Sequence, residues 1–160
     1  MLTHHRRPVC LSLISTDLPI WSTLETAATL YQKDRDRFHV LLKAPPFPTT
    51  TAASPTKPLA DSEREGLLWI ELSPARAIAT MQGQGQLGYR HFWEQGVYGT
   101  SRFWLQGDHL EPYSSLRLRN FTRRVQLTGL PLPESLRVEY ELWSEKLRLG
   151  CYVLSLEIHH

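Results

Sequence analysis

The sequence predicts an α+β protein: a mainly antiparallel β-sheet or barrel of about six or seven strands, packed by one long N-terminal helix. Two observations lead to this fold class. Apolar residues between residues 16 and 44 recur at three- and four-residue steps, which is the spacing of one helix face. From residue 66 onward, short runs of alternating apolar and polar residues are separated by turn residues, with no helical pattern between them.

The composition is that of one globular domain spanning residues 1–160. Hydrophobic residues make up 41% of the chain and charged residues 21%, which suffices for a core and indicates an ordered chain. The formal net charge of +2 is far from the basic excess of a dedicated nucleic-acid binder, so a nucleic-acid partner is not expected. The sequence shows no signal peptide and no apolar run of membrane-spanning length, and a cytoplasmic protein is expected.

The first two predicted elements are a strand and the helix. Residues 8–15, PVCLSLIS, alternate as a strand with one wetter face does. Thr16 or Asp17 can then cap a helix that Pro45 ends, with the charged run at 33–37 on its polar face. The apolar stripe of this helix consists of Trp21, Leu24, Ala28, Tyr31, Phe38 and Leu42.

A linker and a series of strands follow. Residues 45–62 hold five prolines and a Thr/Ala/Ser run, which is typical of a flexible or extended linker. The first and last predicted strands read alike, CLSLIS against YVLSLEI, so they are candidates for neighbouring strands. The strands predicted after the linker cover residues 66–72, 75–82, 91–95, 100–106, 114–128, 135–144 and 150–158.

Residues 83–88, GQGQLG, have the glycine spacing of a dinucleotide-binding loop. That chemistry needs the glycines to open a helix inside a βαβ unit, so that the helix N-terminus faces the pyrophosphate. Gly96 and Gly99 interrupt the residues that follow, and the chain has no βαβ pattern. The motif therefore predicts a glycine-rich hairpin loop, and no cofactor is expected.

Motifs for nucleophiles, acid–base pairs and metals are absent from the sequence. There is no Gly-x-Ser-x-Gly, His-Glu-x-x-His or Cys-x-x-Cys, and His39, His91 and His109 share no ligand spacing. These histidines are predicted to be surface or hydrogen-bonded core residues. Cys10 and Cys151 are predicted to be buried thiols. The sequence therefore leans away from an enzyme and points to no catalytic or metal-binding residue.

Residues 89–104, YRHFWEQGVYGTSRFW, form the most unusual window, because six aromatic residues are interleaved with arginines. Aromatic residues at this density build either a core or the wall of a binding site. Trp, Tyr and Arg are also the residues that dominate binding hot spots. The candidate residues for binding a ligand or a partner are Trp93, Tyr98, Arg102, Trp104, Arg117, Arg119 and Tyr140.

The arginine-rich stretch at 113–127 alternates Leu and Arg and then changes parity. Arg117 and Arg119 are predicted on one face of a strand, and the shift of the apolar residues near Asn120 predicts a β-bulge or a sharp twist. Glu139 and Glu141 on the following strand are predicted to pair with the arginines on a solvated face. A site for an anion or an acidic ligand, and a less favoured surface for single-stranded nucleic acid, stay open as alternatives.

Three short pieces carry a resemblance to a known family: SRFW at 101–104, LRLR at 116–119 and the closing SLEI at 155–158. They resemble barrel strands of the bilin-attaching lyases of cyanobacterial phycobiliproteins. The resemblance covers about a tenth of the chain and does not extend to the N-terminal two fifths. It implies a barrel in which arginines among aromatic side chains hold an acidic tetrapyrrole.

Two functions from different classes follow from these patterns. The first is a non-enzymatic, soluble interaction or assembly protein that presents an aromatic-rich sheet face to a protein partner or to a second copy of the chain. The alternative is a barrel that binds a small acidic hydrophobic molecule, tetrapyrrole- or lipid-like, in the manner of a chromophore lyase. Its wall would consist of Trp93, Tyr98, Trp104 and Tyr140, with Arg102, Arg117 or Arg119 meeting a carboxylate.

Overall fold

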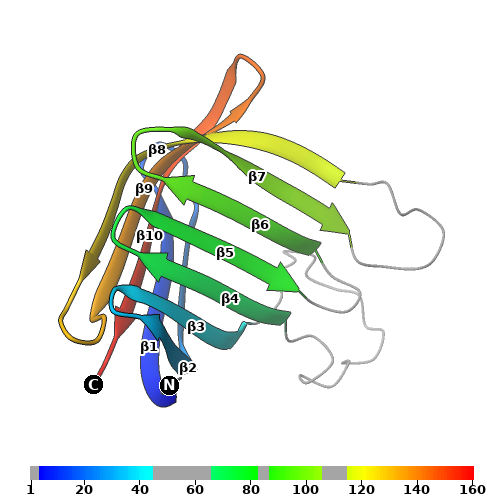
Figure 1. Ribbon diagram of the computed structural model, residues 1–160. Helices are drawn as coiled ribbons and strands as arrows, with labels where there is room; N and C mark the ends of the chain where they lie inside the picture. The colour runs from blue at the N-terminus through cyan, green and yellow to red at the C-terminus, as the bar shows by residue number, and fades with distance from the viewer. Residues whose placement is uncertain (1–3, 45–65, 83–86, 106–114) are drawn as a thin grey trace, which may run out of the picture.

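The computed structural model describes residues 4–44, 66–82, 87–105 and 115–160, which form a closed barrel of antiparallel strands (Figure 1). Each strand pairs with the strands before and after it in the chain, and β1 pairs with β10 to close the ring. The ten strands are β1 (His4–Ser15), β2 (Trp21–Asp34), β3 (Arg37–Ala44), β4 (Gly66–Ser73), β5 (Arg76–Gln82), β6 (Leu87–Glu94), β7 (Tyr98–Leu105), β8 (Ser115–Thr128), β9 (Ser135–Ser144) and β10 (Leu147–Ile158).

The predicted α+β class is wrong, because the described residues contain no α-helix and form ten strands rather than six or seven. The segment predicted as the long helix is the hairpin of β2 and β3, with its turn at residues 35–36 inside the charged run. Trp21, at the head of the predicted apolar stripe, is 74% exposed. Asp17, a predicted helix cap, lies instead in the connection between β1 and β2.

Two features of this segment favour a hairpin over a helix. Phe38, Val40 and Leu42 are buried at every second position, which is the period of a strand and not of a helix. The preceding half repeats threonine, a β-branched residue that fits a pleated strand better than a helix. Pairing with β1 and β4 then incorporates both strands into the barrel, so tertiary contacts override the helical spacing.

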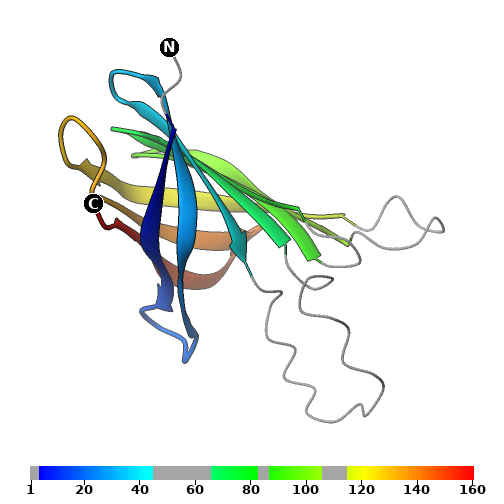
Figure 2. The same cartoon turned by 90° about the horizontal axis from the view of Figure 1, so that it is seen from below.

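The pairing of β1 with β10 confirms that the first and last strands are neighbours. Their register runs from Val9 opposite Ile158 to Ser15 opposite Tyr152. Closing the ring removes the free sheet edges that an open sheet would expose. The two described ends of the chain therefore lie close together at one end of the barrel, together with the β2–β3 turn (Figures 1 and 2).

Alternate side chains of the strands point into the barrel and form its core. Val40, Val138 and Leu156 are fully shielded from solvent, and the apolar residues of nine strands contribute to the same cluster. On β1, Val9 is buried while Leu11 and Leu13 are only partly buried, and on β8 Leu118 is 5% exposed while Leu116 is 56% exposed. The interior is therefore tightly packed near the chain ends and more accessible toward the opposite end.

The predicted β-bulge in the arginine strand is present. The register of β8 against β9 shifts between Thr122 and Arg124, two residues beyond the predicted position near Asn120. Leu118, Asn120 and Thr122 face the interior before the shift, and Val125 faces it afterwards. The extra residue at the bulge lets a single long strand keep its buried residues inside despite the change of parity.

The predicted linker at 45–62 lies outside the described residues, as do residues 83–86 of the GQGQLG motif. The strands on either side of each gap are antiparallel neighbours, with Ala44 opposite Gly66 and Met81 opposite Tyr89. The described residues include no helix with the length and hydrophobicity needed to cross a membrane.

Candidate functional site

A cavity of about 60 Å³ lies inside the barrel. Aliphatic side chains form one part of its wall, and aromatic side chains from β6 and β9 form the other. A cavity of this volume has room for a small chemical group but not for a whole tetrapyrrole. The lining residues are Leu11, Leu13, Leu68, Ile70, Ala79, Tyr89, His91, Trp93, Tyr140 and Leu154.

The aromatic wall follows from the alternation of side chains along β6, which points every second one into the barrel. Tyr89, His91 and Trp93 occupy every second position of this strand and therefore face the same side, the barrel interior. The rings of His91 and Trp93 are stacked, with centroids 4.9 Å apart and an interplanar angle of 8°. Tyr140 of β9 completes the wall, with its ring 5.1 Å from Trp93 and 5.4 Å from Tyr152.

A buried polar network holds His91 in place. The His91 Nδ1 and Ser101 Oγ atoms are 2.7 Å apart, and the Asn120 amide donates to Ser101 Oγ at 2.9 Å. The same amide donates to the Phe92 carbonyl at 3.1 Å, and the Thr122 hydroxyl donates to Asn120 Oδ1 at 3.3 Å. Ser101, Asn120 and Thr122 are fully buried, so these hydrogen bonds fix the imidazole against a rigid support.

The titratable groups around the cavity are neutral at pH 7. Burial lowers the pKa of His91 to about 4, since the interior disfavours the charged imidazolium. Burial raises the pKa of Tyr89 to about 12, and it raises the pKa of Tyr140 even further above the ordinary value. The cavity thus offers rings and neutral polar groups, and none of its lining residues carries a formal charge at this pH.

Trp93 brings an unused hydrogen-bond donor to the cavity wall. Its side chain is 2% exposed, and within the described residues its indole Nε1 has no acceptor. Among all the residues that the structure describes, Arg7 Nε is the other buried side-chain nitrogen without a hydrogen-bond partner. An unpaired buried N–H costs roughly 1–3 kcal/mol, so such a group calls for an explanation.

The structure divides the predicted binding residues between two places. Trp93 and Tyr140 lie together in the interior of the barrel. The outward positions of β7 and β8 hold the other five, namely Tyr98, Arg102, Trp104, Arg117 and Arg119. The seven predicted residues therefore do not form one site, because the sheet separates Trp93 and Tyr140 from the other five.

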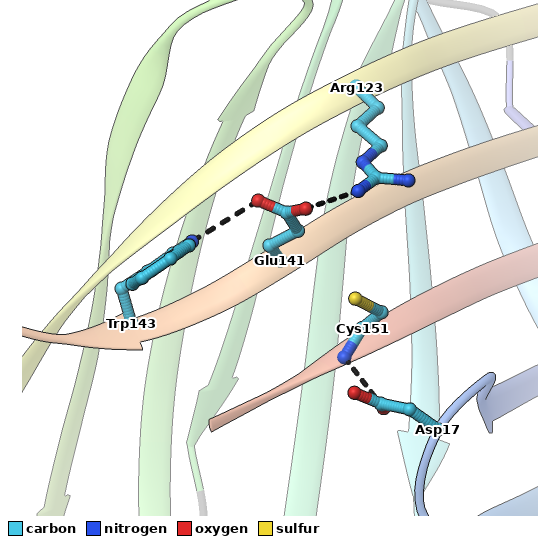
Figure 3. Close-up of polar contacts among 5 residues, drawn as sticks. All are labelled: Asp17, Arg123, Glu141, Trp143 and Cys151. Carbon is cyan, nitrogen blue, oxygen red and sulfur yellow. Dashed lines mark hydrogen bonds and ion pairs between the residues drawn. The ribbon is translucent and has the colours of Figure 1, made fainter. Parts of the chain in front are cut away.

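The glutamates of β9 pair with other arginines than Arg117 and Arg119. Glu141 is bonded to Arg123 and accepts a hydrogen bond from Trp143 Nε1 at 3.2 Å (Figure 3). Glu139 lies 3.1 Å from Arg137 on its own strand. The register of β8 against β9 is the reason, since it sets Glu141 opposite Phe121 and Glu139 opposite Arg124, whereas Arg119 lies opposite Trp143.

The outer side of the barrel also ties the β1–β2 connection to β10. Asp17 Oδ1 accepts a hydrogen bond from the Cys151 backbone N–H at 2.9 Å (Figure 3). It also accepts one from the Ser15 hydroxyl at 3.0 Å. The first of these bonds is the main reason that the pKa of Asp17 lies below its ordinary value. Cys10 and Cys151 are free thiols and are half-buried rather than buried as predicted.

Sequence reasoning missed His91 and Tyr89 as part of the candidate site. His91 was expected to be an ordinary surface or core residue, and only its position two residues before Trp93 on a strand signals a shared face. The polar residues behind it come from β7 and β8, which no local pattern connects. Within the described residues, no group of histidines, cysteines and carboxylates could hold a metal ion.

The fold and the cavity define a closed, ten-stranded antiparallel barrel with an aromatic-walled interior. The chain is similar to the crystal structure of the ywiB protein from Bacillus subtilis, with a TM-score of 0.63 and 10% sequence identity over 97% of this chain and 94% of that chain. At this identity the likeness shows the fold alone. No family model and no curated protein matches the sequence.

Proposed function

We propose that the protein is a small-molecule-binding barrel whose interior cavity receives a neutral hydrogen-bond acceptor at one end of an apolar ligand. The observation that carries this proposal is the buried Trp93 Nε1, which lacks an acceptor among the described residues and belongs to the cavity wall. A carbonyl or ether oxygen of a ligand would satisfy this donor, and Leu11 and Leu13 would contact the apolar remainder.

The electrostatics of the cavity favour a neutral ligand over the acidic one predicted from the sequence. A buried carboxylate needs a cation or several donors to offset its desolvation. His91 is neutral above about pH 4, and Arg102, Arg117 and Arg119 lie on the outer side of the sheet. A carbonyl group makes the same hydrogen bond with Trp93 and loses far less hydration on entering the cavity.

The protein-partner function predicted from the sequence stays a prediction. Its aromatic face would now consist of Tyr98 and Trp104 without Trp93 and Tyr140, which face the interior. The two functions concern opposite sides of the same sheet. A substitution of Trp93 therefore tests the ligand site without changing the outer face.

The proposal can be tested through the indole N–H signals of the five tryptophans in ¹⁵N-labelled protein. The probe is 2-heptanone, which carries one neutral carbonyl acceptor on an apolar chain, and hexane serves as the matched compound without an acceptor. We expect 2-heptanone to shift the signal that is missing from the Trp93→Phe variant. Hexane, which cannot accept a hydrogen bond, should leave the chemical shift of that indole N–H unchanged.

Trp143→Phe is the matched control, because Trp143 Nε1 already donates to Glu141 on the outside. This variant should respond to 2-heptanone as the unaltered protein does. A Trp93 signal that does not move at millimolar 2-heptanone, or one that moves equally with hexane, would contradict the proposed acceptor site.

A further inference from the structure

A row of arginines crosses the outer face of three neighbouring strands. In the strand register Arg90 of β6 lies opposite Arg102 of β7, and Arg102 lies opposite Arg117 of β8. These strands run side by side on the barrel (Figure 1). Since neighbouring strands are about 4.8 Å apart, the three guanidinium groups project from a line perpendicular to the strands.

This row is unfavourable for the fold itself. Like charges directly opposite one another on neighbouring strands are destabilising. Within the described residues, no carboxylate forms an ion pair with Arg90, Arg102 or Arg117, and the glutamates of β9 bind Arg123 and Arg137. An external anion would therefore relieve a repulsion that the barrel does not neutralise by itself.

The outer face of these strands is much more basic than the net charge of the whole chain indicates. Strands β5 to β8 carry seven arginines, no lysine and a single carboxylate, Glu94, which makes a formal charge of +6. All seven arginines are exposed. Because the chain as a whole carries +2, the rest of it contributes −4. The positive potential is thus concentrated on one side of the barrel.

Aromatic rings lie beside the arginine row on the same outer face. Tyr98 is 56% exposed, and the Arg119 guanidinium lies 4.6 Å from the centre of its ring. Phe121, opposite Tyr98 on β8, has its ring 5.0 Å away. Aromatic rings and guanidinium planes are the surfaces on which unpaired bases stack.

We propose that this outer face of β6–β8 binds single-stranded nucleic acid, with phosphates at Arg90, Arg102 and Arg117 and a base against Tyr98 and Arg119. Arginine binds phosphate through two parallel N–H groups, which suits an exposed row of this kind. An acidic polypeptide would use the arginines but leave the rings without a role. The proposal uses none of the residues of the interior cavity, so the two proposals fail independently.

The test is fluorescence anisotropy with a labelled oligothymidylate of about 20 nucleotides. If Arg90, Arg102 and Arg117 each contact one phosphate, the affinity should fall roughly twenty-fold between 50 and 200 mM salt, because the slope of log affinity against log salt is about −0.7 per neutralised phosphate on a single strand. The double variant Arg102→Gln, Arg117→Gln should bind at least tenfold more weakly at 50 mM salt and show a shallower salt dependence. Tyr98→Leu should weaken binding at least fivefold with the salt dependence unchanged.

Arg35→Gln is the control for the loss of an exposed arginine, because it removes one positive charge from the β2–β3 turn, away from this face. It should leave the affinity within twofold. The proposal is overturned if the double variant binds as the unaltered protein does, or if Arg35→Gln weakens binding equally. It is also overturned if poly-glutamate displaces the labelled strand as effectively as unlabelled oligothymidylate, since that result assigns the face to acidic polypeptides. Thermal melting of each variant verifies that it is folded.

Discussion

The imidazole of His91 lies parallel to the indole of Trp93, 4.9 Å away, and its Nδ1 is 2.7 Å from the Ser101 hydroxyl oxygen. A histidine held in this way by a ring on one side and a buried hydroxyl on another is neutral in the folded protein. Protonation would place a charge among buried aromatic and aliphatic side chains with no carboxylate in the cavity wall to offset it.

Stability should therefore fall as the pH is lowered from 6.5 toward 4. In this range the unfolded chain binds a proton at His91, whose ordinary pKa is 6.5, while the folded protein does not, because burial lowers that pKa to about 4. The difference corresponds to roughly 3 kcal/mol at about 1.4 kcal/mol per pKa unit. The contribution is complete above pH 6.5, and urea unfolding at a series of pH values measures its loss.

His91→Gln should flatten this dependence, because glutamine has no proton to gain. His39→Gln is the comparison: His39 accepts a hydrogen bond from Trp69 Nε1 at 3.1 Å, and partial burial also lowers its pKa. Its contribution has the same sign but is smaller, because the side chain borders solvent and Glu71 lies 3.3 Å away. If both variants keep the full pH dependence, the buried state of His91 is not its cause.

Substitutions of Trp93 and Tyr98, two of the predicted binding residues, should differ sharply in their effect on stability. Trp93→Ala removes a fully buried ring and should cost roughly 3–5 kcal/mol. Tyr98→Ala removes a half-exposed ring that contacts Phe121 and Arg119 on the outside and should cost about 1 kcal/mol. Chemical unfolding compares them, and equal losses would contradict the division of these residues between interior and exterior.

Gly99 should resist even the smallest substitution. A Cβ atom at this position would lie 2.1 Å from the carbonyl oxygen of Phe92, which also accepts a hydrogen bond from Asn120. Gly99→Ala must therefore push β6 and β7 apart and should cost roughly 1–3 kcal/mol. Thr100→Ala, at the exposed next position, should cost less than about 0.5 kcal/mol. Thermal melting of the two variants shows whether the close contact with the Phe92 carbonyl causes the loss of stability at position 99.

Deleting residues 48–60 should change stability by less than about 2 kcal/mol. The register places Ala44 opposite Gly66, so the eight residues left between positions 44 and 66 need to connect only two paired strand ends. Loop length enters the closure entropy only logarithmically. A larger loss in urea unfolding would show that the Pro- and Thr-rich stretch contributes packing, contrary to its predicted linker role.

The strands of the C-terminal half were predictable because their apolar and polar residues alternate with the period of a strand. Leu136, Val138 and Tyr140 are all buried at every second position, and the parity change after Asn120 corresponds to a real bulge. The N-terminal hairpin was not predictable by the same means. Its apolar residues fit both a period near 3.6 and a period of two, and only the neighbouring strands select between them.

The sequence by itself determined the alternation of most strands and the bulge in β8, because these depend on side chains next to one another along the chain. The likeness of the first and last strands also indicated that they are neighbours. The tertiary structure alone decided which aromatic residues share a cavity and where the charge gathers. Trp93 meets Tyr140, and Arg90, Arg102 and Arg117 form a row, only because the closed barrel sets distant strands in one register. A net charge of +2 averages over the whole chain, whereas a binding partner meets one face of it.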